Sequence, residues 1–361
     1  MFSVIDSCYN QSNLREGGFD MGVSRITLKD VAEDCGYTMN TVSRALRGDP
    51  RLPESTREKI QRSAVRMGYI RNSLASSLRS GKSGNIAVIV NDVHNLHFCN
   101  MLTIMDSELR KAGYNIMVLC MGLNEELGDH LIRSAISQSV DGILFFPYFD
   151  NREHIEVMEK NRMPYVLLDR RINHAVTDTV RCDDVQGGYL AGAHLAKLGH
   201  KQYLFLSGKD LSSSQIDRLD GFMQAMHEYR IPESGIRVVP GDAVEGALAS
   251  SSLRELLFPL DYTAIVSFRD EVSYPVMMEL SVMGLEFPSD VSIVIFDHLR
   301  GEIPYLPRLT SIFSEGETVA AQGVRLLLEK IANREHPTQV KILPVTLFDE
   351  GTTAAPRVLP E

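Results

Sequence analysis

The sequence contains no tryptophan, and its five cysteines are odd in number and never spaced C-x-x-C. This pattern argues against a disulfide framework and against a thiolate zinc site. No apolar run approaches the roughly 18 to 20 residues that cross a bilayer. The first residues lack a basic start and an apolar stretch of about 7 to 15 residues, which argues against a secretory signal. We therefore expect a cytoplasmic protein that has no membrane partner.

Sequence signatures of enzymes are also missing. GKSG at 81–84 lacks the earlier glycine of a phosphate-binding loop, and neither G-x-S-x-G nor a G-x-G-x-x-G after a strand occurs. The one metal-like pattern combines His94, His97 and Cys99. A loop without metal is the favoured interpretation, because two histidines on a loop need further ligands. We expect no enzyme, no cofactor and no metal site.

The net charge of −10 hides an uneven distribution of charged residues. From Ser24 to Lys82 there are twelve Lys and Arg against six Asp and Glu, so this segment is basic and the remainder of the chain is acidic. A basic segment is attracted to polyanions, whereas an acidic body is repelled by them. The distribution predicts contact with nucleic acid at one end of the chain.

The segment TLKDVAEDCGYTMNTVSRAL, residues 27–46, predicts two short helices separated by a turn. Thr27 is a suitable N-cap for a first helix over about Leu28 to Asp34. Gly36 permits the positive φ that ends this helix, and Thr38 can cap the second. The pattern indicates a helix-turn-helix, and a third helix is expected over about 53–67. The alternative is a plain helical hairpin from a larger helical domain.

The exposed start of the second helix contains side chains suited to reading DNA. If this helix enters a major groove, Met39, Asn40, Thr41 and Arg44 would face base edges and phosphates. Asn40 can read adenine, and Arg44 can read guanine or bind phosphate.

Beyond Ser83, apolar runs alternate with amphipathic stretches. The runs lie at 85–90, 115–120, 142–147 and 164–169, and a second series lies at 202–207, 236–240, 263–268 and 291–296. Continuous apolar runs indicate strands buried on both faces, as in parallel sheets covered by helices. We expect an α/β core of two Rossmann-like lobes, with a ligand at the carboxyl ends of the strands. Glycines at 187, 188 and 192 are expected to allow close helix packing.

Two stretches resemble the head, hinge and first core strand of the lactose/galactose repressor family of bacterial transcription regulators. They are residues 27–46 and the later segment STREKIQRSAVRMGYIRNSLASSLRSGKSGNIAVIV. The segment DDVQGGYLAGAHLAKLGHKQ at 183–202 is a second match, and the similarity covers about 25–355. The resemblance implies a periplasmic-binding-protein-like core, crossed three times by the chain, and a homodimer on double-stranded operator DNA.

The resemblance also implies a hinge that folds on DNA, with Leu78 as a minor-groove wedge and Ala75 beside it. Arg71 and Ser76 depart from the usual hinge of the family, and a flexible linker is the alternative. The residues expected at the DNA are Thr27, Thr38, Met39, Asn40, Thr41, Ser43, Arg44, Arg47, Asn72, Ala75 and Leu78.

By the same resemblance, a small-molecule effector binds between the lobes. Phe98 is expected to pack on the ligand, and Arg218 to bind its hydroxyls or carboxylate. The acids expected there are Asp169, Asp270 and Asp297, and Asp169 and Asp297 could each instead cap the next helix. Arg269 departs from the family pattern. It could pair with Asp270 or Asp297, or select an anionic effector such as a phosphorylated sugar.

The expected organisation is a disordered extension over 1–23, a helix-turn-helix domain over 24–70, a hinge over 71–83, a two-lobed effector-binding and dimerisation domain over 84–350 and a tail over 351–361. Either Met1 or Met21 could be the start, and the lack of C-terminal leucine heptads favours a dimer. The expected function is a repressor of transcription controlled by a sugar, sugar phosphate or nucleoside-like effector. The alternative is a two-lobed small-molecule-binding protein or sugar-modifying enzyme whose head makes protein contacts.

Overall fold

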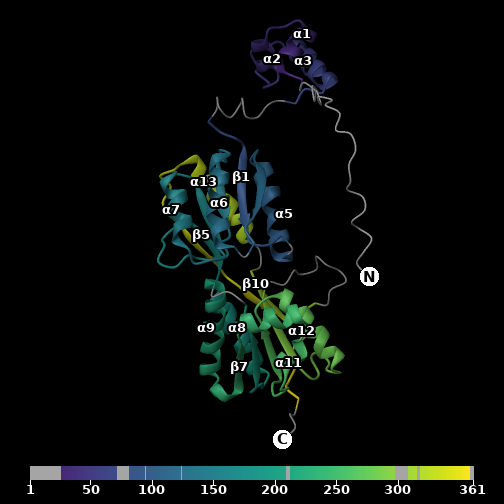
Figure 1. Ribbon diagram of the computed structural model, residues 1–361, viewed down its shortest axis with the longest axis vertical. Helices are drawn as coiled ribbons and strands as arrows, with labels where there is room; N and C mark the ends of the chain where they lie inside the picture. Colours follow the sequence, from purple (N-terminus) through teal and green to yellow (C-terminus); the bar gives the residue numbers. More distant parts are fainter. Residues whose placement is uncertain are drawn as a thin grey trace, which may run out of the picture. The chain divides into compact units, whose positions relative to one another are not determined.

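The computed structural model describes residues 26–70, 81–93, 95–122, 124–208, 212–296, 308–314 and 318–357, apart from the side chains of Asp270 and Glu271. It divides into two compact units, Met1–Ser76 and Ser77–Glu361, and each is considered by itself (Figure 1). The following predictions lie outside the described residues: the extension over 1–23, His94, Asn72, Ala75, Leu78 and Asp297. None of the helices in the described part of the chain has the length and hydropathy needed to cross a membrane.

Three helices form the first unit: α1 (Leu28–Cys35), α2 (Met39–Ala45) and α3 (Glu54–Met67). Val31, Val42 and Ile60 are fully buried at its centre, one from each helix. Ala32 of α1 is 6% exposed, and its small side chain allows close packing at this position. These positions match the apolar spacing that predicted the three helices.

The ends of the head helices follow from their capping residues. Thr27 Oγ1 accepts a hydrogen bond from Asp30 N, and Asp30 Oδ2 accepts one from Thr27 N at 2.7 Å, which together form a capping box. Gly36 ends α1 with φ 74°, in the left-handed region. Thr38 Oγ1 accepts from Thr41 N at 3.2 Å and begins α2. The helix-turn-helix prediction is confirmed.

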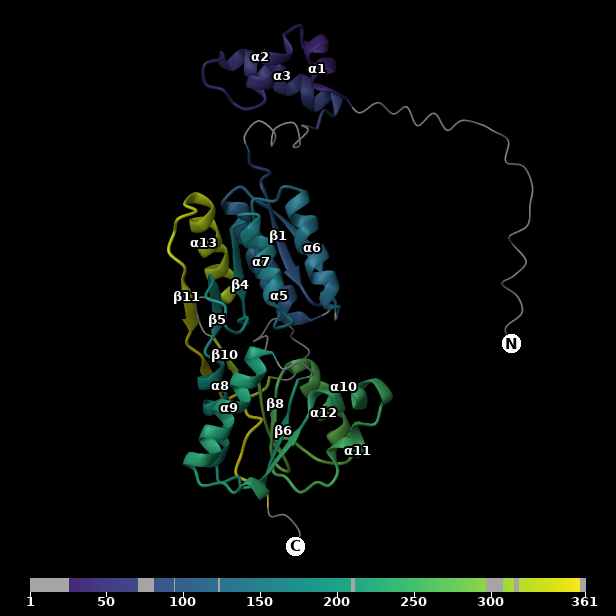
Figure 2. The same ribbon diagram turned by 60° about the vertical axis from the view of Figure 1, so that its left-hand side comes forward.

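The second unit contains two lobes, and each is built on a six-stranded sheet (Figure 2). The sheet of the N-terminal lobe has the order β11-β5-β4-β3-β1-β2 and is entirely parallel. Its strands are β1 (Asn85–Val90), β2 (Asn115–Cys120), β3 (Gly142–Phe145), β4 (Tyr165–Leu168), β5 (Thr179–Cys182) and β11 (Val340–Leu343). One face is covered by α5 (Leu96–Lys111) and α13 (Val319–Ala332), and the other by α6 (Glu125–Ser137) and α7 (Arg152–Lys160).

The sheet of the C-terminal lobe has the order β12-β10-β9-β8-β6-β7, and only β12 runs antiparallel to its neighbour. Its strands are β6 (Tyr203–Leu206), β7 (Ile236–Val239), β8 (Ala264–Ser267), β9 (Ser292–Phe296), β10 (Ser311–Phe313) and β12 (Thr346–Phe348). One face is covered by α8 (Asp184–Lys197) and α9 (Ser213–Glu228), and the other by α10 (Gly241–Ser250), α11 (Leu253–Leu257) and α12 (Asp270–Val282). A 3-10 turn (Glu233–Gly235) precedes β7.

The chain passes between the lobes three times, after β5, after β10 and after β11. The prediction of two Rossmann-like lobes is confirmed. The expectation that every apolar run is buried on both faces is wrong for β2 and β7, which are edge strands. Val118 of β2 is 40% exposed and Val238 of β7 is 39% exposed. Their apolar side chains lie at a sheet edge, where one side has no neighbouring strand.

Candidate functional site

Two glycines bring α8 and α9 into close contact beside the cleft between the lobes. A Cβ at Gly188 of α8 would lie 1.9 Å from the carbonyl oxygen of Arg218, and a Cβ at Gly221 of α9 would lie 1.8 Å from that of Val185. Only residues without a Cβ allow two backbones to approach this closely. The predicted role of this glycine segment in helix packing is confirmed, and the contact fixes Arg218 next to the first turn of α8.

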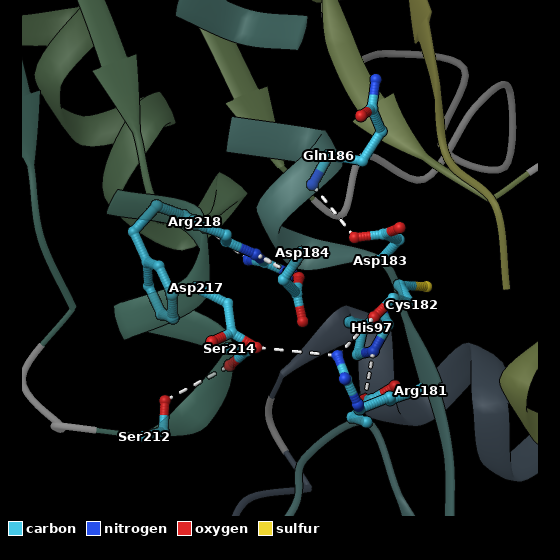
Figure 3. Close-up of polar contacts among 12 residues, drawn as sticks. His97, Arg181, Cys182, Asp183, Asp184, Gln186, Ser212, Ser214, Asp217 and Arg218 are labelled. Atoms are coloured by element: carbon cyan, nitrogen blue, oxygen red, sulfur yellow. Dashed lines mark hydrogen bonds and ion pairs between the residues drawn. The ribbon is translucent and has the colours of Figure 1, made fainter. Parts of the chain in front are cut away.

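Arg218 lies on α9 with 7% of its surface exposed. Its Nε donates to Asp184 Oδ1 at 2.8 Å (Figure 3). Its Nη1 donates to the carbonyl oxygen of Phe268 at 2.9 Å. The guanidinium carbon lies 4.5 Å from the ring centroid of Phe296, a cation-π contact. These contacts hold a planar set of N–H donors in one orientation, which suits hydroxyl or carboxylate oxygens.

Arg218 borders a cavity of about 160 Å³ between the lobes. The cavity lies at the carboxyl ends of strands from both sheets, where open parallel sheets bind ligands. Its lining includes Asn95, Phe98 and Asp169 from one lobe and Ser214, Arg218 and Arg269 from the other. Pockets for drug-sized ligands typically measure about 300 to 1,000 Å³, so this cavity suits a smaller ligand.

Phe98 gives the cavity an apolar wall. It lies in the first turn of α5, is 6% exposed and packs edge-on against Phe146 with 5.1 Å between ring centroids. Asn95 begins the same helix by accepting a hydrogen bond from His97 N at 2.8 Å. Aromatic side chains beside a few oriented polar groups are the usual composition of a small-ligand site.

Asp169 follows β4 with a φ of 63°, in a region that residues other than glycine rarely adopt. Its Oδ2 lies 2.9 Å from Nε2 of His97, and its backbone N donates to the carbonyl oxygen of Val180 at 2.9 Å. The alternative role of a helix cap is wrong for Asp169, because no helix lies between β4 and β5. Backbone strain of this kind clusters at binding and active sites.

The metal-like pattern of the sequence is only partly described by the structure. His97 contacts Asp169, and the thiol of Cys99 donates to the carbonyl oxygen of Val93 at 3.1 Å. Among the described residues, no cluster of three or more histidine, cysteine or carboxylate side chains could hold a metal ion.

Arg269 precedes α12 and lines the cavity. Its Nη2 donates to Oε1 of Glu245 on α10 at 2.5 Å, a partner that the sequence did not predict. The expected partners, the side chain of Asp270 and residue Asp297, are not described by the structure. Arg269 therefore places a cation at the cavity wall. The carboxylate of Glu245 balances its charge.

A direct link between the lobes lies beside the cavity. Nη2 of Arg171, in the loop after β4, donates to Oδ1 of Asp217 on α9 at 2.9 Å, and its Nη1 donates to the other carboxylate oxygen. The backbone N of Arg171 donates to Ser213 Oγ at 3.0 Å, and Arg181 Nη1 lies 3.6 Å from Asp217 Oδ2. The hydrogen bonds that Arg171 donates to the Asp217 carboxylate raise the pKa of the Arg171 guanidinium. On α9, Arg218 thus borders the cavity and the preceding residue binds the opposite lobe.

In the head, the first turn of α2 faces solvent. Met39 is 53% exposed, Asn40 is exposed, and Thr41 Oγ1 lies 3.0 Å from Thr38 Oγ1. Arg44 differs from the simple expectation, because its Nε donates to Asp49 Oδ2 at 2.9 Å. The remaining described candidates are exposed Thr27 and Arg47 and half-buried Ser43.

Sequence reasoning missed three residues of the cleft region: Asp184, Asp217 and Arg171. Asp184 binds Arg218 across 34 residues of sequence, and Asp217 binds Arg171 across 46. Such partners depend on how separate segments pack together. The one available signal was the position of Asp217 immediately before the predicted ligand residue Arg218.

Two family models match the chain. Residues 27–72 match a model described as bacterial regulatory proteins, lacI family. Residues 83–350 match a model described as periplasmic binding proteins and sugar binding domain of LacI family. Together the two matches cover the head and both lobes.

Curated relatives resemble the chain over most of its length. Catabolite control protein A of Priestia megaterium is 29% identical over 311 residues, which cover 86% of this chain and 93% of that protein. The HTH-type transcriptional repressor PurR of Vibrio atlanticus is 26% identical over 331 residues, which cover 90% of this chain and 98% of that protein.

Solved structures share the fold. A LacI family transcriptional regulator from Enterococcus faecium with bound ribose has a TM-score of 0.67 and 26% identity, covering 76% of this chain and 100% of that one. A lac repressor dimer bound to operator and an anti-inducer has a TM-score of 0.79 and 24% identity, covering 91% of this chain and 99% of that one.

Proposed function

Since this chain belongs to the LacI family of bacterial regulatory proteins and is a transcription regulator, we propose that it represses genes by binding operator DNA with an affinity set by a small ligand in the cleft. The observation that carries the ligand control is the pair Asp217 and Arg218. These adjacent residues of α9 contact the opposite lobe and the cavity respectively. A ligand bound at Arg218 therefore acts on the same helix turn that joins the lobes.

This arrangement gives a physical route from ligand to lobe movement. A ligand shifts the population of open and closed lobes only by its difference in affinity for the two states. Because the cavity has walls from both lobes, a ligand that contacts both walls binds the closed state more tightly. The same free energy difference then changes the affinity for DNA, since coupling between sites is reciprocal.

The head supplies the DNA contacts in this proposal. The exposed first turn of α2 enters the major groove, where Asn40 and Arg44 contact base edges, and Arg47 contacts phosphate. One head reads only a few base pairs, so a homodimer on two half-sites provides the specificity. The protein then acts in the bacterial cytoplasm, on chromosomal DNA.

The proposed effector is a small hydroxylated molecule, a sugar, sugar phosphate or nucleoside. Phe98 and Phe146 can pack against an apolar ring face, while Arg218 and Asp169 bind hydroxyls. The similar regulator from Enterococcus faecium contains bound ribose, a small hydroxylated molecule of this class. Arg269 extends the choice to a ligand with a negative group.

The competing proposal is a ligand-binding protein or sugar-modifying enzyme whose head contacts proteins. The basic surplus over 24–82 favours DNA, because contacts with phosphates depend on Lys and Arg. The discriminating experiment incubates the purified chain with fragmented genomic DNA at two salt concentrations and sequences the retained fragments. We expect retention of a few near-palindromic sites, altered by one or more candidate sugars. Retention that is weak and independent of sequence would support the competing proposal.

A further inference from the structure

A second cavity, of about 360 Å³, lies in the N-terminal lobe away from the cleft. It is bordered by Pro164 and Tyr165 at the start of β4 and by Thr177 and Asp178 immediately before β5. These are the amino ends of the strands, whereas the cleft lies at their carboxyl ends. The two cavities are separated by the length of the strands, roughly 13 to 20 Å.

The floor of this second cavity is polar and almost completely buried. Asp178 is 4% exposed, and its Oδ2 lies 2.7 Å from Nζ of Lys330 on α13. Its Oδ1 accepts from the backbone N of Gln339 at 2.8 Å. The hydroxyl of Tyr165 donates to Oε1 of Glu159 at 3.2 Å. Because Lys330 and Asp178 neutralise each other, the floor offers hydrogen-bonding groups without net charge.

Two exposed arginines lie at the rim. Arg162 follows α7, and Arg334 follows α13; both border the cavity. Arg334 Nη1 donates to the carbonyl oxygen of Arg162 at 2.8 Å, which holds the two residues side by side. No ion pair between either guanidinium and a carboxylate occurs within the described residues. Glu159 is the carboxylate that lines the rim, so the rim carries an excess of positive charge.

We propose that this second cavity binds a small anion, the phosphate or carboxylate group of a metabolite. Arginine guanidinium groups bind such oxygens through paired charge-assisted hydrogen bonds, and two arginines held side by side can share one anionic group. The buried hydroxyl and ammonium groups below the rim contact the uncharged part of the ligand. This site shares no lining residue with the cleft.

The position of this cavity suggests what its ligand affects. The backbone N–H groups of Ser83 and Gly84 donate to the carboxylate of Asp141 at 2.9 and 2.8 Å, at the amino ends of β1 and β3. The segment that follows the head in sequence therefore enters the sheet at its amino-terminal edge. The cavity lies at the same edge. A ligand there acts on the lobe at the edge where this connection begins.

The test is isothermal titration of the full chain with inorganic phosphate, and with succinate, at constant ionic strength and without DNA. Arg162→Gly suits the positive φ of 51° at this residue, and it removes the guanidinium with its side chain while the main-chain carbonyl that accepts from Arg334 remains. We expect this variant and Arg334→Gln to weaken binding about five-fold or more. Glu159→Gln keeps the oxygen that accepts from Tyr165 but removes a negative charge, and should strengthen binding. Phosphate and succinate together distinguish a phosphate site from a carboxylate site.

A control variant separates this site from other cationic surfaces. Arg152→Gln changes an exposed arginine at the other end of α7 and should not alter the affinity. The proposal is overturned if neither anion binds at concentrations up to about 20 mM, or if binding occurs but is unchanged in Arg162→Gly. Because no DNA is used, either result is independent of whether the chain represses transcription.

Discussion

Arg171 in the loop after β4 donates two hydrogen bonds to the carboxylate of Asp217 on α9, and this ion pair joins the two lobes of the core. The Asp217 side chain is 8% exposed, while that of Arg171 is 35% exposed, so the pair is only partly screened by water. Neither residue lines the cavity. Closure of the lobes is thus stabilised by a contact that the ligand does not make.

Asp217→Asn should weaken ligand binding although it removes no ligand contact. The substitution removes the charge that favours the closed lobes, so part of the binding free energy must be used to close them. We expect about a five- to ten-fold higher Kd for the effector, measured by isothermal titration.

A double-mutant cycle with Arg171→Gln tests the origin of this effect. If the ion pair is responsible, Arg171→Gln raises the Kd for the effector clearly in the unmodified chain. In the Asp217→Asn background the same substitution should raise it much less. Arg133→Gln, which breaks an exposed pair with Asp129 on α6, serves as the control. Fully additive effects would show that the two residues act separately.

Arg218→Ala should abolish the increase in thermal midpoint that the effector causes, while operator binding persists. The substitution also breaks the buried ion pair between Arg218 and Asp184, and removing one partner of such a pair destabilises a protein by about 3 to 5 kcal/mol. The double variant Arg218→Met with Asp184→Asn should recover most of the stability but not the ligand response. A double variant that responds fully to the effector would contradict the role assigned to Arg218.

Gly188→Ala should destabilise the core strongly, because its Cβ would overlap the Arg218 carbonyl oxygen. The two helix backbones must separate, which costs at least about 1 to 3 kcal/mol. Gly246→Ala is the matched control in α10, where the added Cβ would meet no atom within 4 Å apart from the neighbouring backbone of its own helix. This control should raise the free energy of unfolding by about 0.5 to 1 kcal/mol in denaturant titrations. Equal effects at the two positions would refute the close packing.

Asn40→Ala and Arg47→Gln should alter DNA binding in different ways. Loss of the Asn40 amide should relax the preference at one base position, at a cost of about 1 to 3 kcal/mol. Loss of the Arg47 charge should weaken binding to all sequences and reduce the slope of log K against log salt by about one. Binding to randomised operators at several salt concentrations measures both quantities, and a uniform loss in Asn40→Ala would argue against base reading.

His200 should make the core less stable in mild acid. It is 1% exposed, its Nδ1 lies 2.7 Å from Thr263 Oγ1, and burial lowers its pKa. Because the unfolded state takes up a proton at higher pH than the folded state, the free energy of unfolding falls as the pH drops below about 6.5. Half-buried His194, whose pKa is also lowered by desolvation, contributes in the same direction.

The thermal midpoint of the chain should therefore decrease from pH 7 to pH 5.5. The thermal midpoint of the His200→Gln variant should decrease less over this pH interval. Replacement of exposed His227 by Gln should leave the decrease in thermal midpoint unchanged. A His200→Gln variant with the full pH dependence would assign the effect to other groups.

The strands predicted from sequence are those with a continuous apolar run, such as β1 and β8. The four that were missed, β5, β10, β11 and β12, have three or four residues each, and their sequences, such as TVRC and VKIL, mix polar and apolar positions. They flank the passages between the lobes, and their identity as strands comes from pairing with segments far away in the sequence. Local pattern therefore predicts the centres of the sheets but not the connection between them.

The candidate site shows the same division. Single residues of the cavity, Phe98, Asp169 and Arg218, were predicted because they follow strands or match a family motif. Their partners were not, because the pairing of Arg269 with Glu245 and of Arg218 with Asp184 depends on tertiary packing. In the head, by contrast, Thr27, Gly36 and Thr38 act within a few residues, and their roles follow from local sequence.

The three passages between the lobes mean that neither lobe is a continuous stretch of the sequence. The N-terminal lobe needs α13 and β11, and the C-terminal lobe needs β12, which ends at Phe348 in a chain of 361 residues. The ribosome synthesises the chain from its N-terminus, and a domain generally folds as a unit. Both lobes must therefore wait until β11 and β12 have been synthesised to complete their sheets, whereas the head has all its helices once α3 has been made.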